Sequence, residues 1–291
     1  FLDIADVIDT YIAKTDWRVA ENANMNHSFQ GLMLHLSGTV QARYALEKYP
    51  EEVRAAHEHG YFHIHDLSFG LAGYCAGWSL RDLLLEGFNL TGRSCAGPPR
   101  HFDTALGQMV NFLGTLQNEW AGAQAFNNVD TYLAPFVRHD GLTYKEVKQA
   151  MQKFVFNLNT TSRWGGQSPF TNLTFDLSPP KHLANEAVII GGKLQDAVHG
   201  DFGPEMAMIN KAFLEVMAGG DYDGTKRYSY TRVVAQQSGA SRIEKTSRDG
   251  SISPYRPRVI VGTEADATQL QAQADHERGM SISESIGISV T

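Results

Sequence analysis

The sequence predicts an α/β fold in which strands alternate with long helices. Apolar residues recur at helical spacing over residues 103–126, 143–158 and 203–217, whereas residues 62–67 and 169–176 alternate between apolar and polar side chains. Strands separated by helices of this length pair mainly in parallel, because a parallel pair needs a long crossover connection. The fold is therefore either an α/β barrel or an open α/β sheet.

Further helix signals lie in the N-terminal part of the chain. Residues 2–14 carry apolar side chains at helical spacing, and a second pattern over residues 41–58 restarts at Pro50, a residue suited to a first helical turn. A helix from Ser79 to Phe88 is predicted because serine is a favoured N-cap.

The longest helical pattern, over residues 103–126, contains three glycines. Gly107, Gly114 and Gly122 each lower helix stability by up to about 1 kcal/mol relative to alanine, so we expect another helix to approach closely there. The next helix begins with Thr143 as its N-cap.

The composition changes after Gly224. Residues 225–291 are rich in Ser, Thr, Arg, Gln and Ala, and their large apolar residues gather at 259–261. We expect one domain over residues 1–224 and a divergent, poorly ordered tail over residues 225–291, with one strand near 259–261.

Composition excludes several classes of protein. The 291 residues carry a formal net charge of −7, which argues against a general nucleic-acid or membrane-surface binder. No apolar run approaches the roughly 18 residues of a membrane span, and the start at Phe1 lacks the basic region of a signal peptide. Two cysteines are too few for a disulfide scaffold, so a reduced, cytoplasmic setting is expected.

Cys75 is the first candidate for chemistry. Gly73 and Gly77 let the backbone approach a ligand, while Tyr74 and Trp78 exclude water. The alternative is a small buried hydrophobic residue, which is the usual role of a free cysteine.

Two other patterns indicate sites less specifically. His63 and His65 are two residues apart, as metal ligands on one strand would be in a metal-dependent hydrolase. Such a site also needs further His and Asp ligands downstream, and the alternative is a pair of structural histidines at a barrel rim. The polar segment over residues 160–169 offers backbone amides and Arg163 to phosphate oxygens, although a plain loop would look the same.

Several segments together resemble the anaerobic (class III, glycyl-radical) ribonucleoside-triphosphate reductases. They occur in the family's order and cover residues 1–224 in separated motifs. These segments are ENANMNHSFQGL (21–32), HEHGYFHIHDL (57–67), GYCAGWSL (73–80), QNEWAGAQAFNN (117–128) and GGQSPFTN (165–172).

The resemblance implies the N-terminal part of a ten-stranded α/β barrel that reduces ribonucleoside triphosphates to deoxyribonucleotides without oxygen. It places Cys75 on the first barrel strand, as a hydrogen donor beside the 2′ position of the ribose. It makes His63, His65, Ser168 and Asn172 candidate contacts of the ribonucleotide substrate.

The same resemblance implies cofactors and partners. A dNTP or ATP effector would bind near a dimer interface, with Gln108 and Lys145 as candidate contacts. Formate or a thiol would be the reductant, a radical-SAM enzyme would install the glycyl radical, and the assembly would be a homodimer without nucleic acid or membrane.

The sequence also departs from the family. No cysteine follows Cys95, so the finger-loop cysteine and the zinc-binding cysteines have no counterpart here, and no radical glycine is recognisable. We expect the chain to be catalytically incomplete alone. A non-catalytic nucleotide-binding remnant is the remaining alternative.

Overall fold

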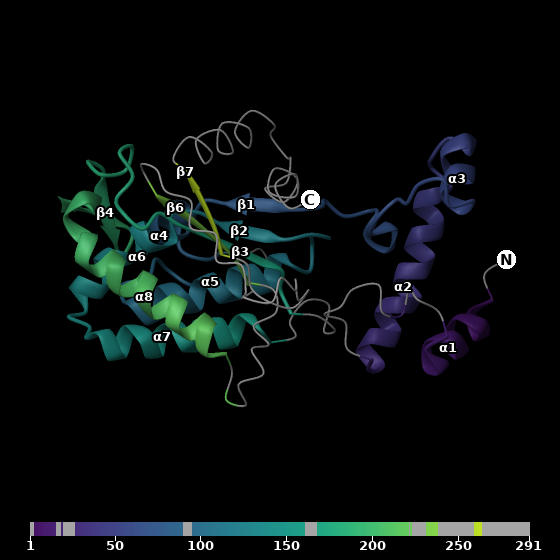
Figure 1. Cartoon of the computed structure of the whole chain (residues 1–291), viewed down its shortest axis with the longest axis horizontal. Coiled ribbons are helices and arrows are strands. Elements are labelled where there is room, and N and C mark those ends of the chain that lie inside the picture. Colours follow the sequence, from purple (N-terminus) through teal and green to yellow (C-terminus); the bar gives the residue numbers. More distant parts are fainter. Residues whose placement is uncertain are drawn as a thin grey trace, which may run out of the picture.

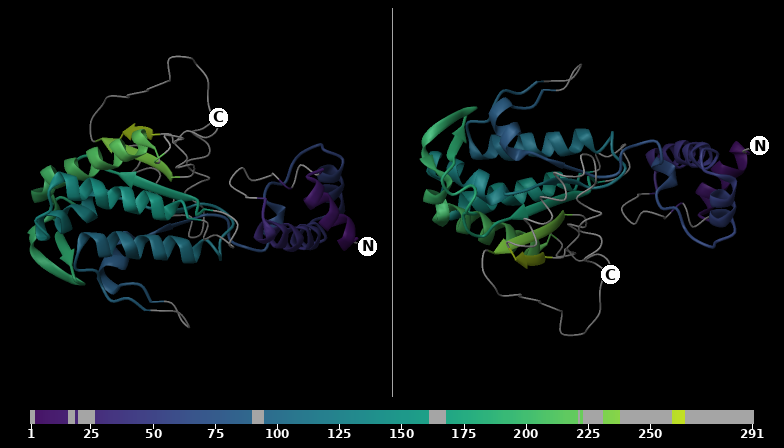
Figure 2. Two further views of the ribbon diagram at one scale, coloured as in Figure 1. Left: turned by 90° about the horizontal axis from the view of Figure 1, so that it is seen from below. Right: turned by 90° about the horizontal axis from the view of Figure 1, so that it is seen from above.

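A computed structural model shows the predicted α/β architecture. It describes residues 3–15, 19, 27–89, 95–160, 168–220 and 222, together with the backbone of residues 231–237 and 259–263. A five-stranded sheet packs against helices, and three N-terminal helices form an arm to one side of it (Figures 1 and 2). Within these described residues, no helix is both long and apolar enough to cross a membrane.

The N-terminal arm, as we call helices α1 to α3, contains α1 (Ile4–Ala13), α2 (Phe29–Leu46) and α3 (Glu51–Glu58). The predicted helix over residues 2–14 is confirmed by α1, whose first turn is capped by the carboxylate of Asp3. The predicted break at Pro50 is also confirmed, because α3 begins directly after it. The 3₁₀ turn Leu67–Phe69 packs against α2.

The sheet is parallel throughout. Its order is β1 (Ala76–Trp78), β2 (Gln124–Phe126), β3 (Thr171–Phe175), β6 (Thr231–Gln237) and β7 (Val259–Thr263). A separate antiparallel hairpin contains β4 (Ala187–Ile190) and β5 (Lys193–Val198).

Helices provide the crossovers and the core. They are α4 (Leu80–Glu86), α5 (Phe102–Leu116), α6 (Val129–His139), α7 (Tyr144–Leu158) and α8 (Gly203–Gly219), with a 3₁₀ turn at His199–Phe202 before α8. In Figure 1, α5, α7 and α8 lie below the strands β1 to β3. Their inward side chains, such as Met109, Phe154 and Phe213, are fully buried in one apolar cluster with the strands.

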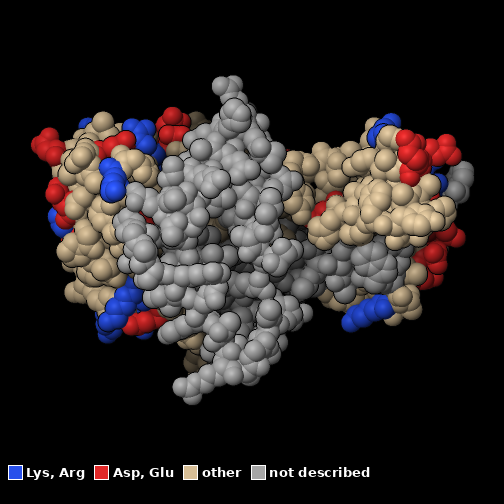
Figure 3. Space-filling view, turned by 45° about the horizontal axis from the view of Figure 1, so that its top comes forward, with Lys and Arg blue, Asp and Glu red and all other residues tan. Residues whose placement is uncertain are grey.

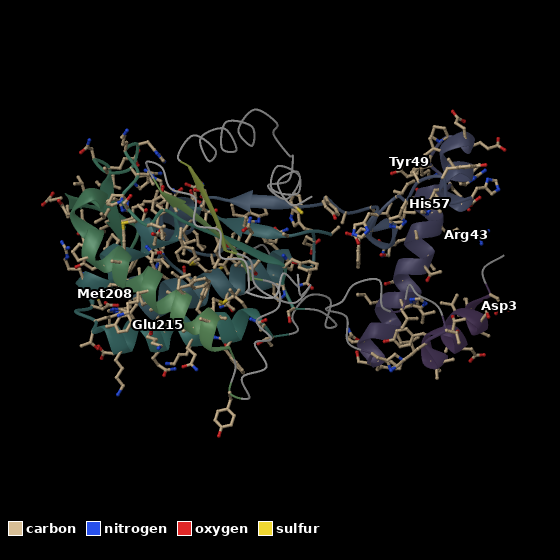
Figure 4. All side chains as sticks on the ribbon, viewed as in Figure 1. Asp3, Arg43, Tyr49, His57, Met208 and Glu215 are labelled. Carbon is tan, nitrogen blue, oxygen red and sulfur yellow. The ribbon has the colours of Figure 1, made fainter. Side chains whose placement is uncertain are left out.

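Several helix predictions are confirmed in their details. Ser79 caps α4, where its hydroxyl accepts a hydrogen bond from the Asp82 amide. Thr143 caps α7 in a complete capping box with Glu146. Ion pairs join neighbouring helices, including Lys148 of α7 with Glu215 of α8 at 2.6 Å, and Glu215 is labelled in Figure 4.

Two predictions about elements are wrong. Residues 62–67 form a loop that leads into the 3₁₀ turn, so their alternation does not reflect a strand. The helix predicted over residues 103–126 ends at Leu116, and its last residues form β2 because that segment pairs with strands on both sides. A Cβ atom added at Gly107 would meet nothing within 4 Å, so this glycine does not mark a close helix contact.

The expected strand near residues 259–261 is confirmed by β7. The sequence did not indicate β6, which pairs with β3 in register from Thr171 and Thr231 onward. The expectation of a poorly ordered tail over residues 225–291 stays a prediction, because apart from β6 and β7 those residues lie outside the described part of the chain.

Candidate active site

Cys75 lies directly before β1, where the sheet is locally irregular. Its side chain is 3% exposed, and its Sγ accepts a hydrogen bond from the Ala123 amide at 3.0 Å. Gly73 pairs with Trp120, 47 residues further along the chain, whereas Ala76 pairs with Gln124, 48 residues further. One extra residue is therefore inserted opposite Cys75, and such bulges commonly redirect side chains near active sites.

Gly122 is the residue that makes room for this sulfur. A Cβ atom at position 122 would lie 2.1 Å from the Cys75 Sγ and 2.8 Å from the Tyr74 carbonyl oxygen. The Gly122 amide also donates to that carbonyl. The glycine that we expected to serve helix packing therefore serves the thiol.

Small side chains lie beside Cys75 on the side of the sheet away from the helices. Gly77, Ala125 and Asn172 are successive partners across β1, β2 and β3, so their side chains share one face. Cys75 precedes Gly77 by two residues and belongs to the same side. The neighbouring Trp78 points to the other side, where its ring packs against Phe112 of α5 at 5.4 Å.

Asn172 occupies the β3 position of this face. Its side chain is 4% exposed, and its Oδ1 accepts no hydrogen bond from the described residues. A buried amide oxygen without a partner is costly in a folded protein, so such an atom marks a place where a polar ligand group fits. The structure thus brings the predicted Cys75 and Asn172 to the same side of the sheet, with β2 between their strands.

The histidines predicted as substrate contacts lie elsewhere. His63 and His65 sit in the exposed loop after α3, with their ring nitrogens 3.4 Å apart. The ring of His63 lies 5.6 Å from that of His57, which Figure 4 shows on the arm, to one side of the sheet. Both histidines therefore lie beside the N-terminal arm.

The other predicted contacts have separate environments. The Ser168 hydroxyl donates to the Asn159 carbonyl at 2.9 Å just before β3. Gln108 is buried in α5, where its Nε2 donates to the Gly97 carbonyl at 2.7 Å, and Lys145 is exposed in the first turn of α7. The predicted phosphate-binding segment lies mostly outside the described residues, since 161–167 are not described.

Within the described part of the chain, no group of three or more His, Cys, Asp or Glu side chains is placed to hold a metal ion. Figure 3 shows basic side chains lying among acidic ones on the face that it draws, and not gathered in one basic patch.

Two buried clusters were not foreseen from the sequence. The first is amide-rich: Gln117 and Gln124 are both fully buried beside β2. Their long-range partners, Phe170 for Gln117 and Trp78 for Gln124, lie 53 and 46 residues away in the chain, so spacing alone could not reveal them.

The second cluster lies at the carboxyl end of β3, around Asp130 and Asp176. The Asp130 carboxylate accepts hydrogen bonds from the amides of Asp176 and Leu177 and from the Asn210 side chain. Burial raises the pKa of Asp130, and burial together with the Asp130 charge raises the pKa of Asp176 to about 7. Both shifts favour the protonated form, so we expect this pair to bind a proton more readily than two exposed carboxylates would.

The family model and the similar proteins described next belong to one family. The model of the anaerobic ribonucleoside-triphosphate reductases matches residues 21–245. The reductase of Enterobacteria phage T4 is 27% identical over 164 residues, which are 48% of this chain and 27% of the relative. The Escherichia coli reductase is 28% identical over 181 residues, 53% of this chain and 25% of the relative. The chain thus spans about a quarter of the length of these curated relatives.

Solved structures agree on the fold. The Thermotoga maritima anaerobic ribonucleotide reductase in complex with dATP and CTP superposes with a TM-score of 0.57 at 17% identity, over 80% of this chain and 44% of that one. The same enzyme with citrate in the active site gives a TM-score of 0.58 at 19% identity, over 79% and 44%. With the family match covering most of its length, the chain belongs to the anaerobic ribonucleoside-triphosphate reductases.

Proposed function

We propose that this chain forms the part of a ribonucleoside-triphosphate reductase that carries the 2′-side thiol of the active site. The observation that carries the proposal is the placement of Cys75. It is buried directly before the first strand, on the side of the sheet that also carries Gly77, Ala125 and Asn172. The reaction is the anaerobic conversion of a ribonucleoside triphosphate to a 2′-deoxyribonucleoside triphosphate.

In this proposal Cys75 donates a hydrogen atom to the substrate radical. The S–H bond breaks and a C–H bond forms at the 2′ carbon, which is left as a radical when the 2′ hydroxyl departs as water. Formate then returns a hydrogen atom to the sulfur radical and becomes CO2 by passing its second electron to the oxidised sugar, or a thiol supplies the same two electrons. The low exposure of Cys75 suits this step, because a radical intermediate needs a pocket that excludes water.

Asn172 is proposed as a contact of the substrate at its ribose. Its free Oδ1 accepts a hydroxyl donor, which a sugar offers and a phosphate does not. Ser168, at the entrance to β3, is proposed to lie beside the same ligand. The loop that carries His63 and His65 is proposed to approach the substrate only when the arm is part of the whole enzyme.

The finer fold is also part of the proposal. The five parallel strands would be one half of a ten-stranded barrel, and the side of the sheet that carries Cys75 would face the barrel interior. Residues 1–224 would form the start of the catalytic domain. The strands β6 and β7 of the tail would continue its sheet.

Partners follow from the same proposal. A dNTP or ATP effector would bind near Gln108 and Lys145 at a homodimer interface. A radical-SAM enzyme would activate the assembly, and formate or a thiol would supply electrons.

The test is anaerobic incubation of the protein with a complementing polypeptide that supplies the finger-loop cysteine and the radical glycine, a labelled ribonucleoside triphosphate, the activating enzyme and formate. We expect Cys75→Ser to bind nucleotide with unchanged affinity and to form no deoxynucleotide, whereas Cys95→Ser, a matched control at an exposed thiol, keeps the wild-type behaviour. Deoxynucleotide formed by Cys75→Ser at the wild-type rate would refute the role. Nucleotide binding without turnover under every condition would indicate a non-catalytic remnant instead.

A further inference from the structure

The Gln124 side chain of β2 connects Trp78 of β1 with the backbone of Gly122 and Ala123, which contacts the Cys75 thiol. This side chain is fully buried on the helix side of the sheet. Its Oε1 accepts a hydrogen bond from the Trp78 indole at 2.6 Å, and its Nε2 donates to the carbonyls of Ala123 at 3.1 Å and Gly122 at 3.4 Å. One carboxamide thus links a β1 side chain to two peptide units of the neighbouring segment.

Those two peptide units are the ones that contact Cys75. The Ala123 amide donates to the Sγ, and Gly122 leaves the space that the sulfur fills. The Ala123 carbonyl also accepts from the Ala76 amide, directly after the cysteine. The position of this irregular segment therefore determines the surroundings of the thiol.

A second buried amide supports the same segment from the other strand. The Gln117 side chain donates to the Phe170 carbonyl at 2.6 Å, and the Gln124 backbone amide donates to that carbonyl at 2.9 Å. Burying an amide costs free energy unless its polar atoms are bonded. The next residue of β2 on this side, Phe126, is apolar, so burial alone does not require glutamine at position 124.

We propose that Gln124 is a positioning residue for Cys75, holding the Ala123 N–H against the sulfur through its links to Trp78 and to the Gly122–Ala123 peptide units. This role rests on the proposed function of Cys75 as the 2′-side thiol. It assigns to the helix side of the sheet a residue that governs the chemistry on the opposite side.

The test measures the alkylation rate of Cys75 against pH in the nucleotide-free protein, by peptide mass spectrometry. The thiolate is the reacting species, and an N–H donor stabilises it. Gln124→Met keeps the length of the side chain but removes its amide. In this variant we expect the midpoint of the pH profile of Cys75 alkylation to move upward by about one pH unit. Below both midpoints, alkylation should then be roughly tenfold slower than in wild type. Cys95 reports in the same sample and should not change.

Loosening of the strand pair alone would have the opposite effect. Water would reach the thiol, the midpoint would move downward, and alkylation would be faster at every pH. Leu133→Ala, at a fully buried α6 position, is the control for general loss of stability and should leave the Cys75 midpoint unchanged.

Trp78→Phe is a second variant in case Gln124→Met does not fold, because it removes only the indole donor and keeps an aromatic ring against α5. We expect a shift in the same direction but smaller, together with faster hydrogen exchange of the Ala123 amide. An unchanged midpoint and an unchanged Ala123 exchange rate in either folded variant would overturn the proposal. Because neither readout needs nucleotide or turnover, it remains decisive even if the proposed reductase function fails.

Discussion

The carboxyl pair Asp130 and Asp176 should make stability depend on pH in an unusual direction. Asp176 accepts hydrogen bonds from the Asn128 side chain and the Thr131 hydroxyl, yet burial and the charge of Asp130 raise its pKa from 3.8 to about 7. The folded state therefore holds a proton that the unfolded chain releases above about pH 4. The contribution of this proton to the free energy of unfolding is fully present below about pH 4 and is lost as the pH rises through 7.

The magnitude follows from the pKa values. One pKa unit corresponds to about 1.4 kcal/mol, so a change from 3.8 to about 7 amounts to on the order of 4 kcal/mol. Part of that loss has already occurred at pH 5. Between pH 5 and pH 8 the remaining loss is about 2 to 3 kcal/mol.

Asp176→Asn removes this titration, and urea unfolding between pH 5 and pH 8 measures it. Burial lowers the pKa of the nearby His199, which acts in the opposite direction, so the informative quantity is the difference between wild type and variant at each pH. Between pH 5 and pH 8, the free energy of unfolding of the variant should rise by about 2 to 3 kcal/mol relative to that of wild type.

Glu146→Gln is the matched control, because the Glu146 carboxylate accepts from the Thr143 amide at 2.8 Å at the start of α7, and this hydrogen bond lowers its pKa, so that the group stays ionised from pH 5 to pH 8. Its cost should be nearly constant over the same range. If the Asp176→Asn difference were equally constant, Asp176 would be ionised in the folded protein at pH 5 and the reasoning would be refuted.

Three further predictions concern single side chains. Gly122→Ala should lower the melting temperature and make Cys75 more reactive, because the added methyl group overlaps the sulfur; overpacking of this kind costs about 1–3 kcal/mol, and an unchanged melting curve would contradict it. Thr143→Ala should cost about 1 kcal/mol in urea unfolding through loss of the α7 cap, and no change would mean that the capping box contributes nothing. His63→Ala with His65→Ala should leave the metal content of the purified protein unchanged by elemental analysis, whereas loss of stoichiometric zinc would revive a metal-dependent hydrolase.

Local signals predicted the helices well because their determinants are local. Thr143 and Ser79 cap helices through contacts within three residues, and Pro50 marks a boundary by its own geometry. The strand predicted over residues 62–67 is wrong because a strand also needs a distant partner, which a local pattern does not reveal. These residues form a loop in which the Ile64 amide donates a hydrogen bond to His57, and no strand in the described part of the chain pairs with them.

The elements and site residues that sequence reasoning missed depend on distant partners. β1 has only three residues, too few to show alternation, and β2 interrupts a helical pattern because strands on both sides pair with it. Cys75 could be singled out by its glycine and aromatic neighbours. Gln124 and Asp176 could not, since the groups that give them a role lie 46 to 48 residues away in the chain.

The most direct test of the central claim is protection of Cys75 by a ribonucleotide. A ribonucleoside triphosphate added under anaerobic conditions should slow alkylation of Cys75 in proportion to its occupancy, while Cys95 reacts at its usual rate. Inorganic triphosphate at the same concentration should protect much less, because it has no hydroxyl groups to donate to the Asn172 Oδ1 that lies on the same side of the sheet as Cys75. Alkylation of Cys75 that proceeds at the same rate with and without saturating ribonucleotide would contradict its placement in the active site.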